Sequence, residues 1–284
     1  MVHSSSFSTQ FRWSDSVPLP AYESRRANPF SDLRDASSDQ KADNPDRGLL
    51  SGSGSSSAFA RPQMLVGSSE NTFQILNKYD TVIIVDDSTS MTKFWTEVSS
   101  ALASLAAIAG TYDEDGIDVH FLNSPQYELH LRTEQDVQQL FNSVSPGGYT
   151  PIGDKLEEFL LPYVKKFKAE YDSLKPGKKT KVKPVNYLII TDGVPSDDPE
   201  SVIEITAKRL DQMNAPLSQV GIQFVQIGNL PEATAYLQEL DDALKGKYGM
   251  RDIVDTTPYH GKLDGDELVK ALTGGINRRM DRKK

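Results

Sequence analysis

Apolar positions follow two different periods along the chain, which predict strands and helices in turn. Continuous apolar runs such as TVIIVD at 81–86 and VNYLIITDG at 185–193 are typical of parallel strands buried on both faces. Between them, apolar residues recur three or four positions apart, as in the predicted helix at 92–110 with Val98 and Leu102 on one face. This alternation of strand and helix is typical of a doubly wound α/β sheet.

Six strands are predicted in a mostly parallel, Rossmann-like sheet with helices on both faces. The segment at 127–133 follows the strand at 117–123 after too short a connection for a parallel crossover, so we expect it to be an antiparallel edge strand. Right-handed crossovers elsewhere predict the strand order 3-2-1-4-5-6. The predicted strands are 81–86, 117–123, 127–133, 185–193, 220–228 and 251–257. The predicted helices are 92–110, 134–144, 152–173, 198–214, 231–246 and 264–279.

The N-terminal part of the chain lacks these periods. Residues 1–72 are rich in Ser and include SGSGSSS at 51–57, so we predict a disordered tail ahead of a folded domain at 73–284. Within the tail, Pro20–Tyr22 in VPLPAYESRR could dock on an aromatic groove of the WW type. A chance occurrence of these residues is the preferred interpretation.

Composition narrows the classes of function. The 284 residues include 31 basic and 40 acidic side chains, and this acidic balance argues against a general nucleic-acid or membrane-surface binder. Without cysteine there are no disulfides and no thiolate metal sites, so oxygen atoms or the four histidines must bind any metal. We find neither an apolar run long enough to span a bilayer nor a secretory signal, and expect a cytoplasmic protein.

Two of the predicted strands end in polar runs, DDSTSM at 86–91 and TDG at 191–193. In the predicted order, the first and fourth strands flank the switch point of the sheet, where the carboxyl ends of the strands form a ligand-binding crevice. The Gly-rich loop SPGGYTPIGD enters the next helix and can lie over the same crevice. The candidate metal ligands brought together in this way are Asp86, Ser88, Ser90, Thr150 and Asp192.

Oxygen ligands of this kind suit a hard divalent cation. Asp86, Ser88 and Ser90 alternate along a turn and can face one point, which favours Mg²⁺, with Mn²⁺ or Ca²⁺ as alternatives. Hydroxyl groups outnumber carboxylates in the set, so a bound ion would keep excess positive charge. An Asp or Glu side chain of a partner protein would supply the missing negative ligand.

The three segments DDSTS, GGYTPIG and TDG, in this order, resemble the metal-ion-dependent adhesion site of von Willebrand factor A domains, which integrin I domains share. The resemblance extends from about Tyr79 to the C-terminus. It implies that Ser88 and Ser90 bind the ion directly and that Thr150 binds directly or through water. It also implies that Asp86 and Asp192 hold the ion mainly through water. Without disulfides or a signal peptide, the chain resembles the intracellular, often fungal or copine-like members, which implies a scaffold or adaptor role.

Other interpretations of the same residues remain open. DDSTS could simply cap the helix that follows it. The acid pair Asp86 and Asp87 also suits a Mg²⁺-dependent phosphoryl-transfer or receiver-like enzyme, but the third and fifth strands end in LHLRT and FVQIG, without the Asp and Lys that a receiver needs. No general base is evident, so we expect no catalytic residues and no turnover. A third interpretation makes the tail the interacting part and the domain a passive scaffold.

The remaining sequence features have ordinary explanations. The five lysines of the loop Lys175–Lys183 are predicted to form a solvated insertion, with a docking patch for acidic chains as the alternative. A phosphate-binding loop at GKKT is rejected because a helix, not a strand, precedes it. The scattered histidines His3, His120, His130 and His260 are predicted to be structural or solvated.

Overall fold

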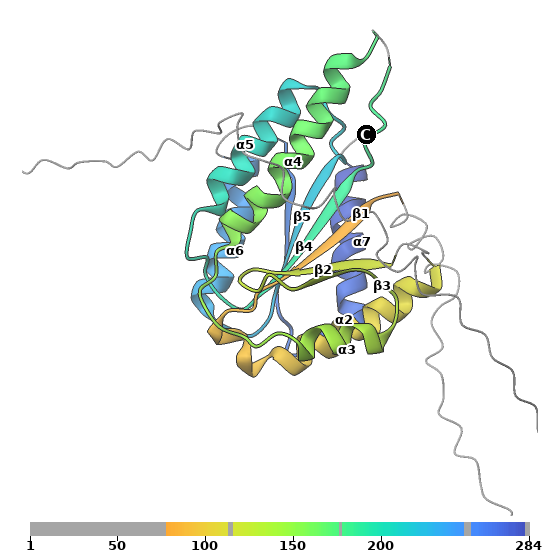
Figure 1. The fold of residues 1–284 in the computed structure, drawn as a ribbon. Helices are drawn as coiled ribbons and strands as arrows, with labels where there is room; N and C mark the ends of the chain where they lie inside the picture. The colour runs from red at the N-terminus through yellow and green to blue at the C-terminus, as the bar shows by residue number, and fades with distance from the viewer. Residues whose placement is uncertain (1–77, 113–115, 176–177, 247–250, 282–284) are drawn as a thin grey trace, which may run out of the picture. The chain divides into compact units, whose positions relative to one another are not determined.

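The central feature of the fold is a six-stranded sheet in the order β3-β2-β1-β4-β5-β6, which confirms the predicted order (Figure 1). A computed structural model of the chain describes residues 78–112, 116–175, 178–246 and 251–281. Strand β3 runs antiparallel to β2 as predicted, and all other neighbours are parallel. The predicted tail at 1–72, with Pro20–Tyr22 in it, lies outside the described residues.

Strand and helix alternate along most of the described chain, apart from one pair of successive strands and one pair of successive α-helices. The strands are β1 (Asp80–Val85), β2 (Ile117–Phe121), β3 (Tyr127–Leu131), β4 (Val185–Thr191), β5 (Val220–Gln226) and β6 (Val254–Thr257). The helices are the 3₁₀ turn η1 (Thr89–Lys93) and α2 (Trp95–Tyr112), α3 (Glu134–Asn142), α4 (Ile152–Ser173), α5 (Pro199–Gln212), α6 (Pro231–Gly246) and α7 (Gly265–Asp281).

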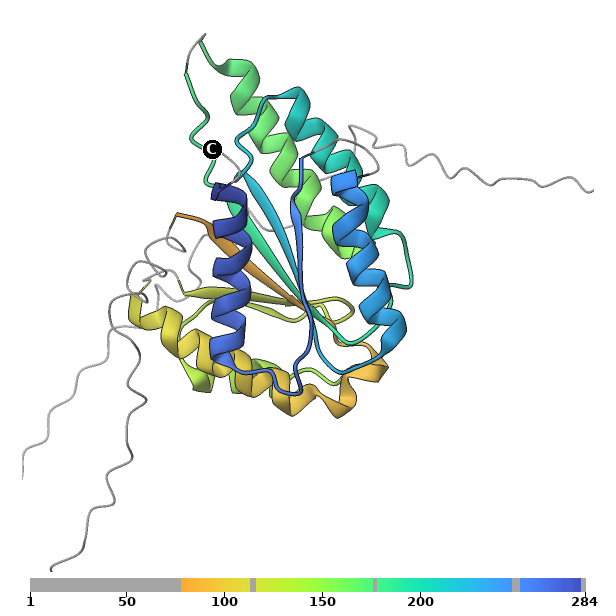
Figure 2. The same cartoon turned by 180° about the vertical axis from the view of Figure 1, so that it is seen from behind.

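Helices cover both faces of the sheet because successive side chains of a strand point to opposite sides. Ile84 of β1 belongs to the core that packs under α4, α5 and α6, whereas its neighbour Ile83 belongs to the core under α2, α3 and α7. Both side chains are fully buried. Figures 1 and 2 show the two helical layers from opposite sides. This double burial explains the uninterrupted apolar runs Val82–Val85 of β1 and Tyr187–Ile190 of β4.

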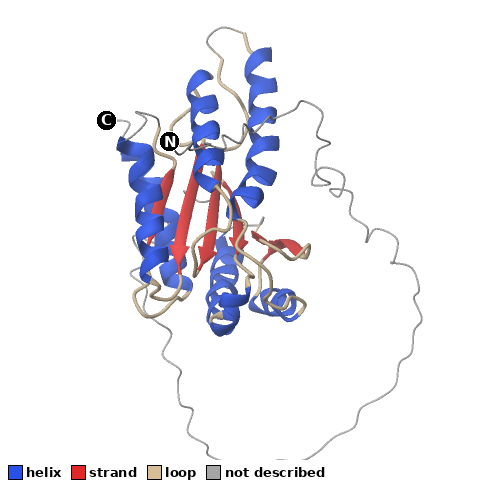
Figure 3. Ribbon diagram, turned by 90° about the vertical axis from the view of Figure 1, so that its left-hand side faces the viewer, coloured by secondary structure: helices blue, strands red, loops and turns tan. Residues whose placement is uncertain are grey.

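The carboxyl ends of the parallel strands lie at one edge of the sheet, where several of the connecting loops gather (Figure 3). β1 and β4 are direct neighbours, with Val85 opposite Ile190 in register. The pairing continues beyond the last strand residue, because the Asp86 N–H donates to the Ile190 carbonyl at 2.9 Å. The polar runs that follow β1 and β4 are therefore side by side, as the strand order predicted.

Local sequence signals explain where several elements begin. The Thr133 side chain accepts a hydrogen bond from the Asp136 N–H and caps α3, the helix predicted at 134–144. The helix predicted at 92–110 instead starts as the turn η1 and continues as α2 from Trp95. No helix in the described ranges combines the length and apolar character needed to cross a bilayer.

Candidate metal centre

Asp86 lies directly after β1 and is fully buried between the ends of β1 and β4. Its Oδ1 accepts the Ser88 N–H at 2.8 Å, and its Oδ2 accepts the Thr191 hydroxyl at 2.6 Å. A carboxylate has about four lone-pair positions, so these two bonds fix its orientation and leave acceptor capacity on both oxygens. Asp86 is thus held in place by its own turn and by the neighbouring strand.

Ser88, Ser90 and Asp192 form a continuous chain of hydrogen bonds across the two strand ends. The Ser90 hydroxyl donates to Asp192 Oδ1 at 2.6 Å, and the Ser88 and Ser90 Oγ atoms are 3.1 Å apart. Because Ser90 has one proton and gives it to Asp192, Ser88 donates to Ser90. Two predicted ligands from DDSTS and one from TDG therefore meet, although 102 residues separate Ser90 from Asp192.

The Gly-rich loop brings Thr150 to the same place. The Gly147 N–H donates to the Asp87 carbonyl at 2.6 Å, and the Thr150 carbonyl accepts the Ser196 N–H at 2.9 Å. The loop is therefore fastened to the residues after β1 and to those after β4. A Cβ placed on Gly193 would lie 4.0 Å from the Thr150 Oγ1. Thr150 is buried here, beside the TDG turn.

Asp87 has a different role from its neighbour Asp86. It is almost fully buried, and its carboxylate accepts the Asn123 N–H at 2.7 Å, the Asn123 side-chain amide at 3.0 Å and the Ser124 N–H at 2.8 Å. The Asn123 amide also donates to the Tyr149 carbonyl at 2.9 Å. Asp87 and Asn123 together tie the ends of β1 and β2 to the Gly-rich loop.

Sequence reasoning missed this support, and two signals could have indicated it. Asn123 follows a strand that neighbours β1, at the same edge of the sheet. Gly148 has φ +92°, and a Cβ there would lie 2.7 Å from Asn123 Oδ1, so the loop needs glycine for both its backbone and its close approach. Thr191 of TDG is a further supporting residue, because its hydroxyl holds Asp86.

The capping interpretation of DDSTS is not supported by the local geometry. Ser88 occupies the N-cap position of η1, yet its side chain makes no capping hydrogen bond. Its hydroxyl is directed to Ser90 instead. The Thr89 side chain reaches the Gly148 carbonyl at 3.4 Å, away from this chain of hydroxyls. The hydroxyls of Ser88 and Ser90 thus contact each other, whereas the Thr89 hydroxyl contacts the Gly-rich loop.

The electrostatics of the site favour a cation. Burial raises the pKa of Asp86, and the nearby Asp192 charge adds to this effect, while hydrogen bonds from Thr191 and Ser88 lower it. Lys93 approaches Asp192 Oδ2 at 3.7 Å, but its side chain is 67% exposed. Two buried carboxylates are therefore faced by one largely solvated ammonium group, and a divalent cation would offset their charge more fully.

Both the hydroxyls and the carboxylates of the candidate site are suitable ligands for a hard divalent ion. Among the described residues, no group of three or more His, Cys, Asp or Glu side chains is placed to hold a metal. The five candidates instead offer two carboxylates and three hydroxyls, all of them oxygen donors. Mg²⁺ accepts such ligands and usually retains several waters, so a partly protein-bound ion is chemically consistent with this set.

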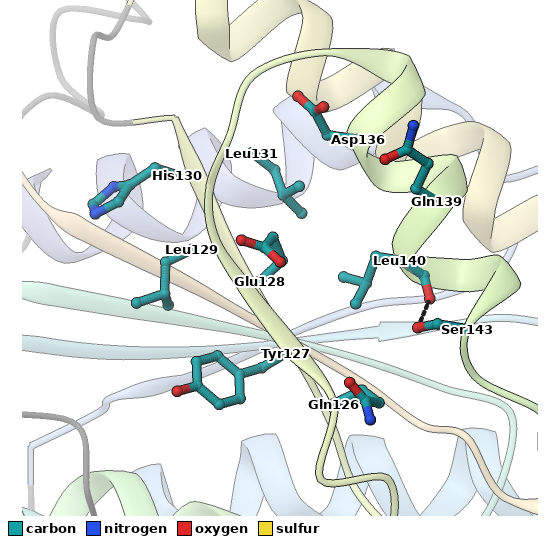
Figure 4. A pocket seen from close by; sticks show the side chains of 10 residues that line it. All are labelled: Gln126, Tyr127, Glu128, Leu129, His130, Leu131, Asp136, Gln139, Leu140 and Ser143. Carbon is teal, nitrogen blue, oxygen red and sulfur yellow. Dashed lines mark hydrogen bonds between the residues drawn. The ribbon is translucent and has the colours of Figure 1, made fainter. Parts of the chain in front are cut away.

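A separate cavity of about 500 Å³ lies elsewhere, between the edge strand β3 and α3 (Figure 4). It is lined by Glu128, His130, Asp136 and Gln139 together with Leu129 and Leu140, among others. None of the five candidate ligands lines it. This cavity and the candidate metal centre are therefore distinct features of the domain.

The lysine-rich loop also lies away from the centre. Lys183 forms an ion pair with Asp80 at 2.9 Å, at the start of β1 and so at the opposite end of that strand from Asp86. The Lys181 N–H donates to Glu170 near the end of α4. These contacts attach the described part of the loop to the amino edge of the sheet.

No protein-family model matches the chain, and no relative was found among curated proteins. Solved structures similar to the chain include those of the following three proteins. Proximal thread matrix protein 1 from the mussel byssus is 18% identical, with 70% of this chain and 47% of that chain covered and a TM-score of 0.38. The pilus adhesin SpaC from Lactobacillus rhamnosus GG is 15% identical, with 72% and 30% covered and a TM-score of 0.38.

The third is the ArnB paralog VWA2 from Sulfolobus acidocaldarius, which is 16% identical, with 70% and 45% covered and a TM-score of 0.33. The chain spans less than half the length of each of these solved chains. The similarity is distant and concerns the fold alone.

Proposed function

We propose that this domain is a non-catalytic protein-binding module that docks an acidic side chain of a partner through a divalent cation, Mg²⁺ in the first place. The proposal assigns Ser88, Ser90 and Thr150 as hydroxyl ligands, with Asp86 and Asp192 as the carboxylates that hold the ion directly or through water. Such an ion would supply an open, positively charged coordination position. The residues of the chain hold and orient it, and the partner completes its ligands.

The observation that carries this proposal is the hydrogen-bonded chain from Ser88 through Ser90 to Asp192, next to the buried Asp86. Two strand ends and a fastened loop keep these oxygens in one place, so little conformational entropy remains to be lost when a cation binds. A site built in advance on rigid elements is a mark of a binding function.

The surroundings favour docking over chemistry. An enzyme of the phosphoryl-transfer or receiver-like type would use Asp86 and Asp87 as an acid pair. The Asp87 carboxylate is already committed to three donors on Asn123 and Ser124. The pair therefore does not act at one point, which supports a module without catalytic residues.

The proposed class is the von Willebrand factor A type, with the metal-ion-dependent adhesion site complete at all five positions. The motif order and the strand order support this assignment. We further propose an adaptor or scaffold role in the cytoplasm, which rests on composition and is tested by fractionating cells that express the full chain.

Metal binding is tested by titration calorimetry of the full chain with Mg²⁺ and Mn²⁺. We expect one site, lost in Asp86→Ala, Ser88→Ala and Ser90→Ala. Thr89→Ala is a matched control, because it removes a neighbouring hydroxyl that has a different partner. At a hundredfold excess over Kd, Mg²⁺ should raise the free energy of unfolding by about 2.7 kcal/mol. A wild-type chain that takes up neither ion would contradict the site.

Partner binding is tested by affinity purification with Mg²⁺ or EDTA. The baits are the wild type, Asp86→Ala and a chain lacking residues 1–72. We expect a protein captured in Mg²⁺ by the wild type and by the shortened chain, and lost with EDTA and with Asp86→Ala. A partner that needs residues 1–72 and ignores the metal would show that the tail is the interacting part.

A further inference from the structure

Exposed apolar side chains occur in the loops at the carboxyl edge of the sheet, the edge that carries the candidate metal centre. Five large apolar side chains are exposed among the described residues. Three of them follow elements that end at the carboxyl edge of the sheet: Tyr149 is 79% exposed, Val194 is 41% exposed and Leu230 is 47% exposed. We call these three residues the apolar rim.

Each rim residue stands next to a component of the site. Tyr149 directly precedes Thr150, Val194 comes two residues after Asp192, and Leu230 follows β5, whose neighbour is β4. The Ile227 N–H donates to the Thr191 carbonyl at 2.9 Å, so the segment leading to Leu230 starts beside TDG. The rim thus comes from three loops at the same edge of the sheet as the candidate metal centre.

Hydrogen bonds from side chains and from the main chain hold the backbone of all three loops. The Tyr149 carbonyl accepts the Asn123 amide at 2.9 Å, although the ring of Tyr149 is free of the core. Val194 lies between Gly193, whose N–H donates to Thr191 Oγ1, and Ser196, whose N–H donates to Thr150.

The Leu230 carbonyl accepts the Thr234 N–H at 3.1 Å, the Thr234 hydroxyl at 3.2 Å and the Gln226 amide at 3.4 Å. Because the backbone of these loops is already fixed, little backbone entropy is lost when a partner covers the exposed apolar side chains. They are therefore suitable anchor residues for an interface. A tyrosine is the most favourable of the three, because its ring buries a large area with few rotatable bonds.

We propose that the partner segment is a linear acidic motif in which the metal-binding Asp or Glu has a bulky apolar side chain within two residues of it. The acid would face the centre, and the apolar neighbours would pack on Tyr149, Val194 and Leu230. The exposed ammonium of Lys93, 3.7 Å from Asp192, adds positive charge at this edge and favours the same acidic segment. This inference rests on the proposed function and specifies the partner of that site.

The test uses a library of random linear peptides displayed on phage and selected on the full-length protein, in Mg²⁺ and in parallel in EDTA. We expect peptides recovered only with Mg²⁺ to contain Asp or Glu with Leu, Phe, Ile, Tyr or Trp within two residues. One such peptide, labelled with fluorescein, then serves as the probe for Kd by anisotropy.

The rim variant carries Tyr149→Ser, Val194→Ser and Leu230→Ser. It should bind the probe at least about tenfold more weakly, with the Kd for Mg²⁺ unchanged. The matched control is Tyr171→Ser with Leu217→Ser, because these are the other two exposed apolar residues of the described chain. Leu217 precedes β5 and Tyr171 lies near the end of the 22-residue α4, so both are remote from the rim. The control should change probe binding less than twofold.

The outcomes separate this inference from the function on which it rests. Mg²⁺-dependent acidic peptides without apolar neighbours, or a rim variant that binds as tightly as the wild type, would overturn the inference and leave metal docking intact. A selection that yields no Mg²⁺-dependent acidic peptide would contradict metal docking itself. Dimers of the wild type that the rim variant does not form, seen by sedimentation, would show that a second copy occupies the rim.

Discussion

Two regions of this domain bury charged side chains and stabilise them in different ways. Near the amino end of β6, Arg251 is buried, and its guanidinium donates to Asp211 at 2.7 Å and to the carbonyls of Ala215 and Pro216 at 3.0 and 3.2 Å. At the other edge, Asp86 and Asp192 are buried with hydroxyl donors and one exposed lysine.

The comparison distinguishes a structural ion from a candidate binding site. The charge of Arg251 is neutralised inside the chain, so its role is to fasten the segment before β6 to the end of α5. The two carboxylates after β1 and β4 are oriented but only partly neutralised by Lys93, which costs stability unless a cation is added. Loss of Arg251 should therefore destabilise the fold, whereas loss of charge at Asp86 should not.

The largest effect is expected for Arg251→Met. It removes the donors of two carbonyls and of Asp211, and should lower the free energy of unfolding by about 3 to 4 kcal/mol in urea denaturation. The value stays below the top of the range for buried pairs because Asp211 is 42% exposed. Asp211→Asn, which keeps an acceptor, is the control and should cost about 1 kcal/mol. A loss in Arg251→Met no larger than in this control would remove the contrast between the two regions.

His120 is a further buried ionisable side chain, and its effect on stability can be tested by changing the pH. It is buried between Tyr127 and Phe159, with ring centroids at 5.1 and 4.8 Å, and burial lowers its pKa from 6.5 to about 4, with a further contribution from Lys155. The unfolded chain takes up the proton first, so stability is lost as pH falls from 6.5 towards 4, by about 3 kcal/mol.

His120→Phe should abolish that part of the acid sensitivity in urea denaturation at pH 7 and pH 4. The exposed His260, replaced in His260→Gln, provides the control and should leave the pH dependence as in the wild type. If the wild type and His120→Phe showed equal pH dependence, folding would not lower the pKa of His120.

Most substitutions of buried residues lower the free energy of unfolding, but Asp86→Asn should not. The raised pKa of Asp86 means that its contribution to stability is present below the unfolded pKa and is lost as pH rises through the folded pKa. Without metal at pH 7, the neutral amide should leave the free energy of unfolding unchanged or raise it by about 1 kcal/mol. The stabilisation by Mg²⁺ should disappear at the same time. A metal-free variant less stable than the wild type would indicate that Asp86 is a structural acid like Asp87.

The smallest effect is expected for Lys93→Gln. Because the Lys93 ammonium is largely exposed and lies 3.7 Å from the Asp192 carboxylate, the free energy of unfolding should change by less than about 0.5 kcal/mol. Removing this positive charge beside the site should tighten Mg²⁺ binding about threefold, with a smaller effect at high salt. Calorimetry at two salt concentrations measures the Mg²⁺ affinity and its salt dependence. Weaker Mg²⁺ binding by Lys93→Gln would show that the Lys93 charge does not oppose the binding of the ion.

Much of the fold could be predicted because strongly periodic segments specify their own elements. The helix at 152–173 is observed as α4 with the same bounds. The strand predicted at 251–257 is shorter, Val254–Thr257, because an edge strand extends only as far as its single neighbour pairs with it, and β5 pairs with it over Ile222–Val225. The start of the helix predicted at 92–110 also shifted, since η1 forms first.

The sequence by itself determined the alternation of elements, the strand order and the polar residues at the ends of β1 and β4. These follow from local periodicity and from the handedness of crossovers, which act over short stretches of chain. Only the tertiary structure decided that Asp86 faces the candidate site while Asp87 binds Asn123, and that Tyr149, Val194 and Leu230 stand around it. Such roles depend on contacts between segments tens to a hundred residues apart. Adjacent residues point in different directions, so local sequence does not show which of the two makes the contact.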